Sequence, residues 1–122
     1  MTIIEAINRI DALKPNGYGQ AEKIKWLSDL DRTVKAEIID THEGGGEAFA
    51  GYGSDTPLDT VLLIPELYDD VYVKWLEANI DYANGEYGKY NNSIAMFNSE
   101  YSGFRRYYNR THMPLGKSFH FF

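Results

Sequence analysis

The sequence predicts a mainly α-helical fold, and three observations lead to this prediction. Near the C-terminal end, aromatic and apolar residues recur at alternating steps of three and four, which is the spacing of one helix face. Two other stretches, 20–42 and 66–83, carry apolar residues at helical spacing. Only residues 47–64 have the composition of short strands. We therefore expect a four-helix domain over residues 1–113, with a helical hairpin and at most one small β-hairpin, followed by an extended tail over residues 114–122.

The first helix is expected over residues 2–13. Thr2 and Glu5 have the Thr-x-x-Glu spacing of a capping box, in which each side chain bonds the backbone N–H of the other residue. The run 14–17 (KPNG) consists of turn-forming residues and ends this helix. The residues expected on its buried face are Ile3, Ile7 and Ile10.

The second helix is expected over residues 20–42, where the charged residues fall mainly on the face opposite the apolar stripe. The glycine run 44–46 cannot continue this helix. After it, residues 48–52 and 60–64 form either the two strands of a small hairpin or parts of an ordered loop, and the sequence does not decide between them. The apolar stripe of the second helix consists of Ile24, Leu27, Leu30, Val34 and Ile38.

The third helix is expected over residues 66–83, with Pro65 beside its first turn. It is apolar over more than half its circumference, so we expect it to be the most buried helix, with Trp75 in the core. Asn84-Gly85 then predicts a tight turn, and a kinked continuous helix is the alternative. One apolar face consists of Leu67, Val71, Trp75, Ala78 and Tyr82, and a neighbouring face of Tyr72, Leu76, Ile80 and Ala83.

The fourth helix is expected over residues 87–110 and carries the heptad stripe. The run 113–116 (MPLG) ends it, and the aromatic tail follows. Three Phe in the last four residues would be costly to leave in water, so we expect them to dock on this chain or on a neighbouring subunit. The stripe consists of Tyr87, Tyr90, Ile94, Phe97, Tyr101, Phe104 and Tyr108.

Charge is distributed unevenly along the chain. The net charge is −6, but residues 1–100 alone carry −10 and residues 101–122 carry +4. One interpretation is a basic helix end, because cations favour the last turn of a helix. The other is head-to-tail self-association, in which the basic end of one copy meets the acidic body of the next. The candidate interface residues are Tyr101, Arg105, Arg106, Arg110, Phe119, Phe121 and Phe122.

The composition offers no catalytic constellation, so we expect a protein that is not an enzyme. The 122 residues include no Cys, which excludes disulfides and thiolate chemistry. The glycine run lacks the Lys-Ser/Thr of a phosphate-binding loop, and the three His have no metal-ligand spacing. We predict no catalytic residue, no cofactor and no metal. The apolar runs are too short to span a membrane, so a cytoplasmic protein without membrane contact is expected.

Four stretches resemble small prophage proteins of Gram-positive bacteria: 63–70 (LIPELYDD), 82–93 (YANGEYGKYNNS), 96–98 (MFN) and 107–112 (YYNRTH). They are similar to virion-morphogenesis proteins of the head–tail connector (adaptor) type. The resemblance implies a mostly helical, non-enzymatic subunit that assembles into a ring of copies of itself between portal and tail. It implies portal and tail proteins as partners, a lumen that DNA can traverse without sequence-specific contacts, and a location in the virion, with the host cytoplasm during assembly. The alternative is a small phage accessory or regulatory protein that binds one host or phage partner.

Overall fold

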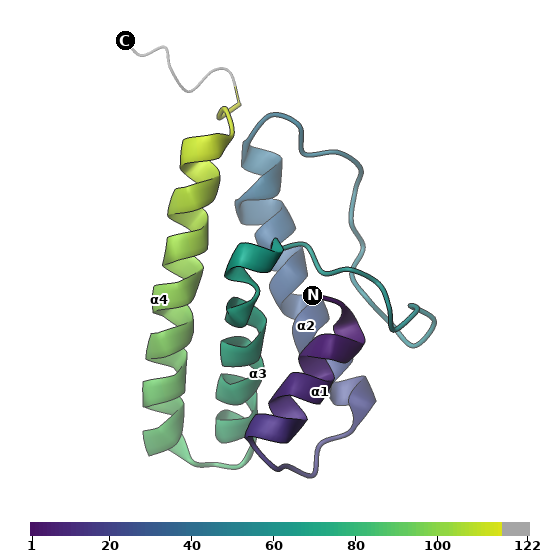
Figure 1. Ribbon diagram of the computed structural model, residues 1–122, viewed down its shortest axis with the longest axis vertical. Coiled ribbons are helices and arrows are strands. Elements are labelled where there is room, and N and C mark those ends of the chain that lie inside the picture. The colour runs from purple at the N-terminus through teal and green to yellow at the C-terminus, as the bar shows by residue number, and fades with distance from the viewer. Residues whose placement is uncertain (116–122) are drawn as a thin grey trace.

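The computed structural model describes residues 1–115, and it is mainly helical (Figure 1). No β-strand occurs within this range; there are only two isolated bridges. The predicted fold class is therefore confirmed. The helices are α1 (Ile3–Leu13), α2 (Gln20–Glu37), α3 (Asp70–Ala83) and α4 (Tyr87–Thr111), with short 3-10 turns at Ile39–Thr41 and Glu66–Tyr68.

The start of α1 has the predicted capping box. The backbone N–H of Glu5 donates to the Thr2 hydroxyl at 3.2 Å, and the backbone N–H of Thr2 donates to Glu5 Oε1 at 2.8 Å. These two bonds satisfy donors that the first turn of a helix leaves unpaired. They also lower the pKa of Glu5, mainly through the bond from the Thr2 backbone.

Two helix boundaries differ from those predicted by more than one residue. The second helix ends at Glu37 instead of residue 42, because residues 39–41 tighten into a 3-10 turn. The Thr41 hydroxyl donates to Ile38 O at 2.8 Å and so bonds a carbonyl at the end of the helix. The third helix begins at Asp70 instead of residue 66, since residues 66–68 form a 3-10 turn after Pro65.

Residues 84–86 form a tight turn and not a kink. Gly85 has φ of 75°, a left-handed conformation that favours glycine. Its N–H donates to Tyr82 O at 3.0 Å, and the N–H of Glu86 donates to Asp81 O at 2.9 Å. The turn reverses the chain, so α3 and α4 form the predicted antiparallel helical hairpin (Figure 1).

The strap, which we define as residues 43–65, does not form the small hairpin. Residues 60–62 instead bond the N-terminus: Ile3 N donates to Thr60 O at 3.0 Å and Leu62 N to Met1 O at 2.9 Å. The other half of the strap is held by a side chain of α2, because Tyr52 N donates to Ser28 Oγ at 2.9 Å. The two segments therefore form hydrogen bonds with different parts of the chain and not with each other. Neither of the strands considered for 48–52 and 60–64 forms.

Asp31 of α2 holds the strap from inside. Its side chain is fully buried and accepts three hydrogen bonds. Tyr52 donates to Oδ2 at 2.5 Å, Tyr72 of α3 to Oδ1 at 2.6 Å, and the backbone N–H of Leu63 to Oδ2 at 3.0 Å. The carboxylate thus joins the two halves of the strap to α2 and α3.

The stability of the fold should depend on the titration of Asp31. Burial raises the pKa of this carboxyl, and the bonds from Tyr52, Tyr72 and Leu63 offset part of the rise. The native state therefore binds more protons than the unfolded state between the ordinary and the raised pKa, and stability increases as pH falls through that window. We expect urea unfolding to show wild type gaining stability relative to Asp31→Asn between neutral pH and about pH 4. A difference that is constant or shrinks on acidification would contradict this assignment.

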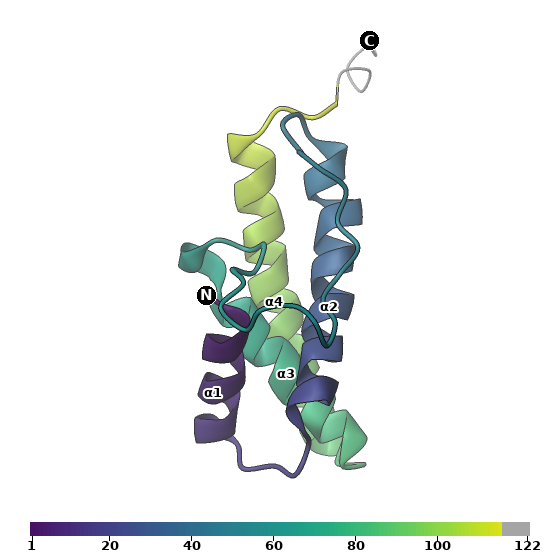
Figure 2. The ribbon, with the colours of Figure 1, turned by 90° about the vertical axis from the view of Figure 1, so that its right-hand side faces the viewer.

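The third helix is the most buried, as predicted, with seven of its 14 residues buried against three of 25 in α4. It lies between α4 on one side and α1 and α2 on the other (Figures 1 and 2). The face that forms the core is the one with Tyr72, Leu76 and Ile80, each 0% exposed. The other predicted face is open at both ends, because Leu67 is 76% and Tyr82 59% exposed.

Candidate functional site

The predicted interface residues fall into two groups on α4. Arg106 and Arg110 are exposed and make no ion pair with any residue in the range 1–115. Tyr101 is half-buried and turns toward the core, and Arg105 is close to it. The first group, Arg106 and Arg110, is therefore exposed to solvent, and the second is the Tyr101 ring with Arg105 beside it. The other three predicted residues, Phe119, Phe121 and Phe122, lie outside the described residues.

Arg105 connects α4 to α2. Its guanidinium forms an exposed ion pair with Glu37 at 3.3 Å and lies 5.5 Å from the centre of the Tyr101 ring. An exposed pair of this kind contributes little to stability, because water and salt screen it. The pair spans the space between the two helices one turn beyond Tyr101.

The Tyr101 hydroxyl is buried and has no hydrogen-bond partner among residues 1–115. Its ring stacks on Phe97, with 5.4 Å between the ring centres. Burial raises the pKa of Tyr101, and the positive charge of Arg105 offsets part of the rise.

Tyr101 lines a groove between α2 and α4, which we call the α2–α4 groove. The groove has a volume of about 380 Å³. Trp75 of α3 lies in its floor, where the indole N–H donates to Trp26 O at 2.7 Å and the ring packs 4.9 Å from Phe97. Trp75 is therefore only partly buried, in contrast to the expected core position. The groove is lined by Asp29, Leu30 and Thr33 of α2, Trp75 and Asn79 of α3, and Phe97 and Tyr101 of α4.

A second, smaller hollow continues the α2–α4 groove along the seam of α3 and α4. It shares Trp75 and Asn79 with the groove and is also lined by Ala78, Tyr82, Tyr90 and Ile94. The exposure of side chains in the predicted heptad stripe differs along α4: Phe104 is 0% exposed, whereas Tyr87 at the far end is 58% exposed. The sequence analysis missed the groove, because its lining comes from three separate helices and no local pattern marks it.

The strap forms an acidic edge. Residues 43–65 contain no Lys or Arg, and their four acidic side chains are all exposed. The part around residues 51–60 runs along the edge of the molecule opposite α4 (Figure 1). The absence of Lys and Arg from residues 43–65 can be read from the sequence, and it would have identified this patch. The four acids are Glu43, Glu47, Asp55 and Asp59.

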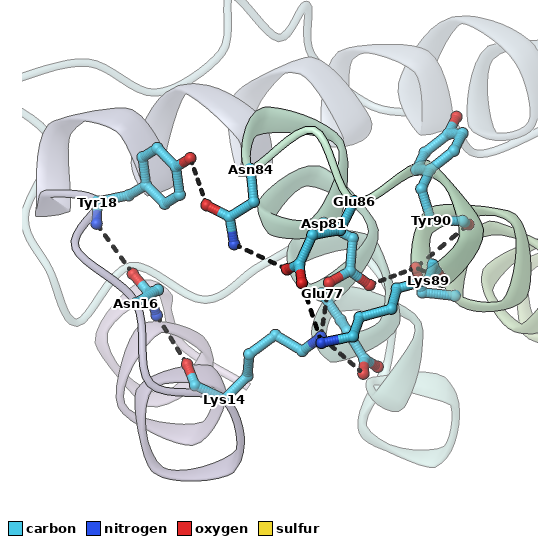
Figure 3. A network of polar contacts seen from close by, with 10 residues as sticks. Lys14, Asn16, Tyr18, Glu77, Asp81, Asn84, Glu86, Lys89 and Tyr90 are labelled. Atoms are coloured by element: carbon cyan, nitrogen blue, oxygen red, sulfur yellow. Dashed lines mark hydrogen bonds and ion pairs between the residues drawn. The ribbon is translucent and has the colours of Figure 1, made fainter.

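An ionic network around the buried carboxylate of Asp81 lies at the end of the bundle where α1 ends and α4 begins (Figure 3). Lys14 after α1 donates to Asp81 Oδ1 at 2.6 Å, and Ser93 of α4 donates to Asp81 Oδ2 at 2.9 Å. Burial opposes the charge of Lys14, but the hydrogen bond from its ammonium to Asp81 and the negative charges nearby raise its pKa overall. Asp81 is 1% exposed, so this network serves to hold α1, α3 and α4 together.

The buried side chain of His42 also has a structural role, because both of its ring nitrogens contact protein groups. His42 Nδ1 lies 2.6 Å from Ile38 O, and Nε2 lies 2.9 Å from Asn109 Oδ1 on α4. The neighbouring backbone is tied to the end of α4 as well, since the N–H of Glu43 donates to Met113 O at 2.8 Å. Within residues 1–115, no group of three or more His, Cys, Asp or Glu side chains is arranged to hold a metal ion.

We found no match of this chain to a protein family model, to a curated protein or to a solved structure. In the part of the chain that the structure describes, none of the helices combines the length and the hydropathy needed to cross a membrane. The candidate features are therefore two surfaces and one groove: the basic end of α4, the acidic strap, and the α2–α4 groove.

Proposed function

We propose that this chain is a non-enzymatic structural protein of a phage, a head–tail connector subunit that assembles with copies of itself into a ring. Its other partners would be the portal and tail proteins, and DNA would pass through the lumen without sequence-specific contacts. The subunit would act in the virion and, during assembly, in the host cytoplasm. The sequence resemblance is one support for this proposal, and the placement of charge is the other.

The observation that carries the proposal is a pair of complementary patches on different edges. Arg106 and Arg110 are exposed on α4, and the part of the acidic strap around residues 51–60 runs along the opposite edge of the molecule (Figure 1). A contact between two different patches is heterologous, and it closes into a ring when the rotation between subunits permits. Complementary charges steer such a contact and set its register. The patches are exposed, so salt should weaken the contact.

Reversing charge on α4 should reduce particle assembly. We expect a prophage that encodes Arg106→Glu with Arg110→Glu to produce at least about tenfold fewer tailed, DNA-filled particles, since like charges would face each other across the contact. Particles are counted by electron microscopy and infectious titre. Lys25→Glu is the matched control, because Lys25 is an exposed cation of α2 whose only ion pair in the described part of the chain is local, with Asp29 at 3.1 Å.

A compensating change makes this test specific. Combining the double reversal with Asp55→Lys and Asp59→Lys restores opposite charges across the same contact, so particle yield should recover. An unchanged yield in the α4 variant, with the protein folded by circular dichroism, would refute the ring contact. Failure of the compensating pair would show that the basic end meets a partner other than the strap.

The second candidate function is that of a small accessory protein which binds one host or phage partner. The α2–α4 groove favours it, because apolar and aromatic side chains beside a small number of polar ones are typical of recognition sites. A protein that remains monomeric at high concentration and at low salt, and that still yields particles after charge reversal, would support this function over the ring.

A further inference from the structure

The α2–α4 groove lacks an occupant among residues 1–115, and its chemistry indicates what would fill it. Trp75, Phe97 and Tyr101 present ring surface to it, so an apolar or aromatic segment is the matching ligand.

We propose that the α2–α4 groove is the docking site for the aromatic C-terminal segment, residues 116–122, of the same chain. The inference concerns the free chain and stands whether or not the protein forms a connector ring. It has three supports: the position where the described chain ends, the length of the remaining segment, and the order of its residues.

The described chain ends beside the top of α2. Leu115 N donates to Thr41 O at 3.1 Å, so the segment begins at this level. Below Thr41, Glu37, Thr33 and Asp29 follow down the same face of α2 at one-turn intervals, about 6 Å apart at a helical rise of roughly 1.5 Å per residue. Thr33 and Asp29 line the α2–α4 groove, and Glu37 stands above it.

An extended segment reaches these levels in the right order. At roughly 3.3 Å per residue, Lys117, Phe119 and Phe121 come about 7, 13 and 20 Å beyond Leu115. Lys117 would meet the carboxylate of Glu37, and the two rings would reach Tyr101 and Phe97. Alternate residues of an extended chain point to the same side, so Lys117, Phe119 and Phe121 share one side, and His120 and Phe122 point to the other.

A spin label provides a direct test, because the chain contains no Cys and Ser118→Cys creates a unique attachment site. The nitroxide should broaden the indole N–H signal of Trp75 and the amide signals of Thr33 and Tyr101, while the amide of Arg9 on α1 remains sharp. In a mixture of ¹⁵N-chain without label and ¹⁴N-chain with label, broadening should be absent. No broadening in the labelled chain would overturn the proposal, and broadening in the mixture would show that the segment docks on a second copy instead.

Matched variants identify the side of the segment that binds. On the labelled chain, Phe119→Ser with Phe121→Ser should weaken the broadening at Trp75 and Tyr101, whereas Phe122→Ser should preserve it. Thr33→Arg places a long charged side chain in the α2–α4 groove from an exposed position and should also weaken the broadening without unfolding the protein. Equal effects of Phe122→Ser and of the double variant would contradict the alternation and overturn this mode of docking.

A peptide assay supplies an independent measurement. A full-length chain with Phe119→Ser and Phe121→Ser should bind a peptide of residues 116–122, followed by tryptophan fluorescence, and the wild-type chain should bind it at least about tenfold more weakly because its own segment competes. A peptide with Ser at positions 119 and 121 should lose at least about tenfold in affinity. Equal affinity of the two peptides would refute aromatic recognition by the groove.

Discussion

Replacing Asp31 by Ala should destabilise the protein by about 3–5 kcal/mol, a large part of the about 5–15 kcal/mol that holds a small domain together. The substitution leaves three donors without an acceptor: the buried hydroxyl of Tyr72, the part-buried hydroxyl of Tyr52 and the part-buried backbone N–H of Leu63. A buried donor without a partner costs about 1–3 kcal/mol. Removal of the buried negative charge returns part of this cost, which sets the upper limit of the expected loss.

The same substitution should release the strap. Tyr52 and Leu63 lie in its two halves, and Asp31 Oδ2 accepts from both. We therefore expect chymotrypsin to cleave Asp31→Ala after Phe49 and Tyr52 faster than wild type under native conditions. Urea unfolding and timed proteolysis measure the two effects separately.

Asp29→Ala is the matched control for both measurements. Asp29 lies on the same helix, but its carboxylate is partly exposed, and within residues 1–115 its ion pair is the local one with Lys25. It should cost less than about 0.5 kcal/mol and leave the cleavage rate unchanged. Similar losses for the two Asp variants would show that Asp31 does not hold the strap.

Phe104→Ala should cost about 3–5 kcal/mol and lower Tm by about 10–20 °C. Phe104 is 0% exposed and belongs to the core that unites the helices. Its ring packs 5.9 Å from those of Tyr68 and Tyr108, so its removal leaves a cavity against large side chains that cannot easily collapse. Calorimetry measures this loss.

Tyr87→Ala is the control from the same heptad stripe. Tyr87 is 58% exposed at the other end of α4 and contacts Tyr82, with 5.5 Å between the ring centres. Its loss should be below about 1 kcal/mol. Equal effects at the two positions would mean that the stripe is buried uniformly, as in a helix covered along its full length, and would contradict the graded burial of α4.

The gradient of burial along α4 bears on the proposed function. A stripe that is core at Phe104 and open at Tyr87 leaves ring surface at one end of the α3–α4 seam. At the other end of α4, Arg106 and Arg110 are exposed. One helix thus contributes to the core, to the α2–α4 groove and to an outward basic surface, which suits a protein whose function is binding.

Helix positions were predictable because their signals are local. The capping box of Thr2 and Glu5 lies within one turn, and the periodic apolar residues of α2, α3 and α4 identify each helix without its neighbours. The charge difference between body and C-terminal end is also a property of the sequence itself. The shortened ends of α2 and α3 escaped prediction, because 3-10 turns differ from α-helix by a single hydrogen-bond step.

Only the tertiary structure decided what those helices bury and what they leave open. The sequence showed two apolar faces on α3, and the arrangement of α1, α2 and α4 around it covers Tyr72 fully and leaves Trp75 in a groove. In the sequence, Asp31 resembles the other acids of an amphipathic helix. In the tertiary structure it is buried and accepts hydrogen bonds from donors 21, 32 and 41 residues away. Periodicity records which faces are apolar, but burial depends on contacts between residues distant in the chain, and no local pattern encodes them.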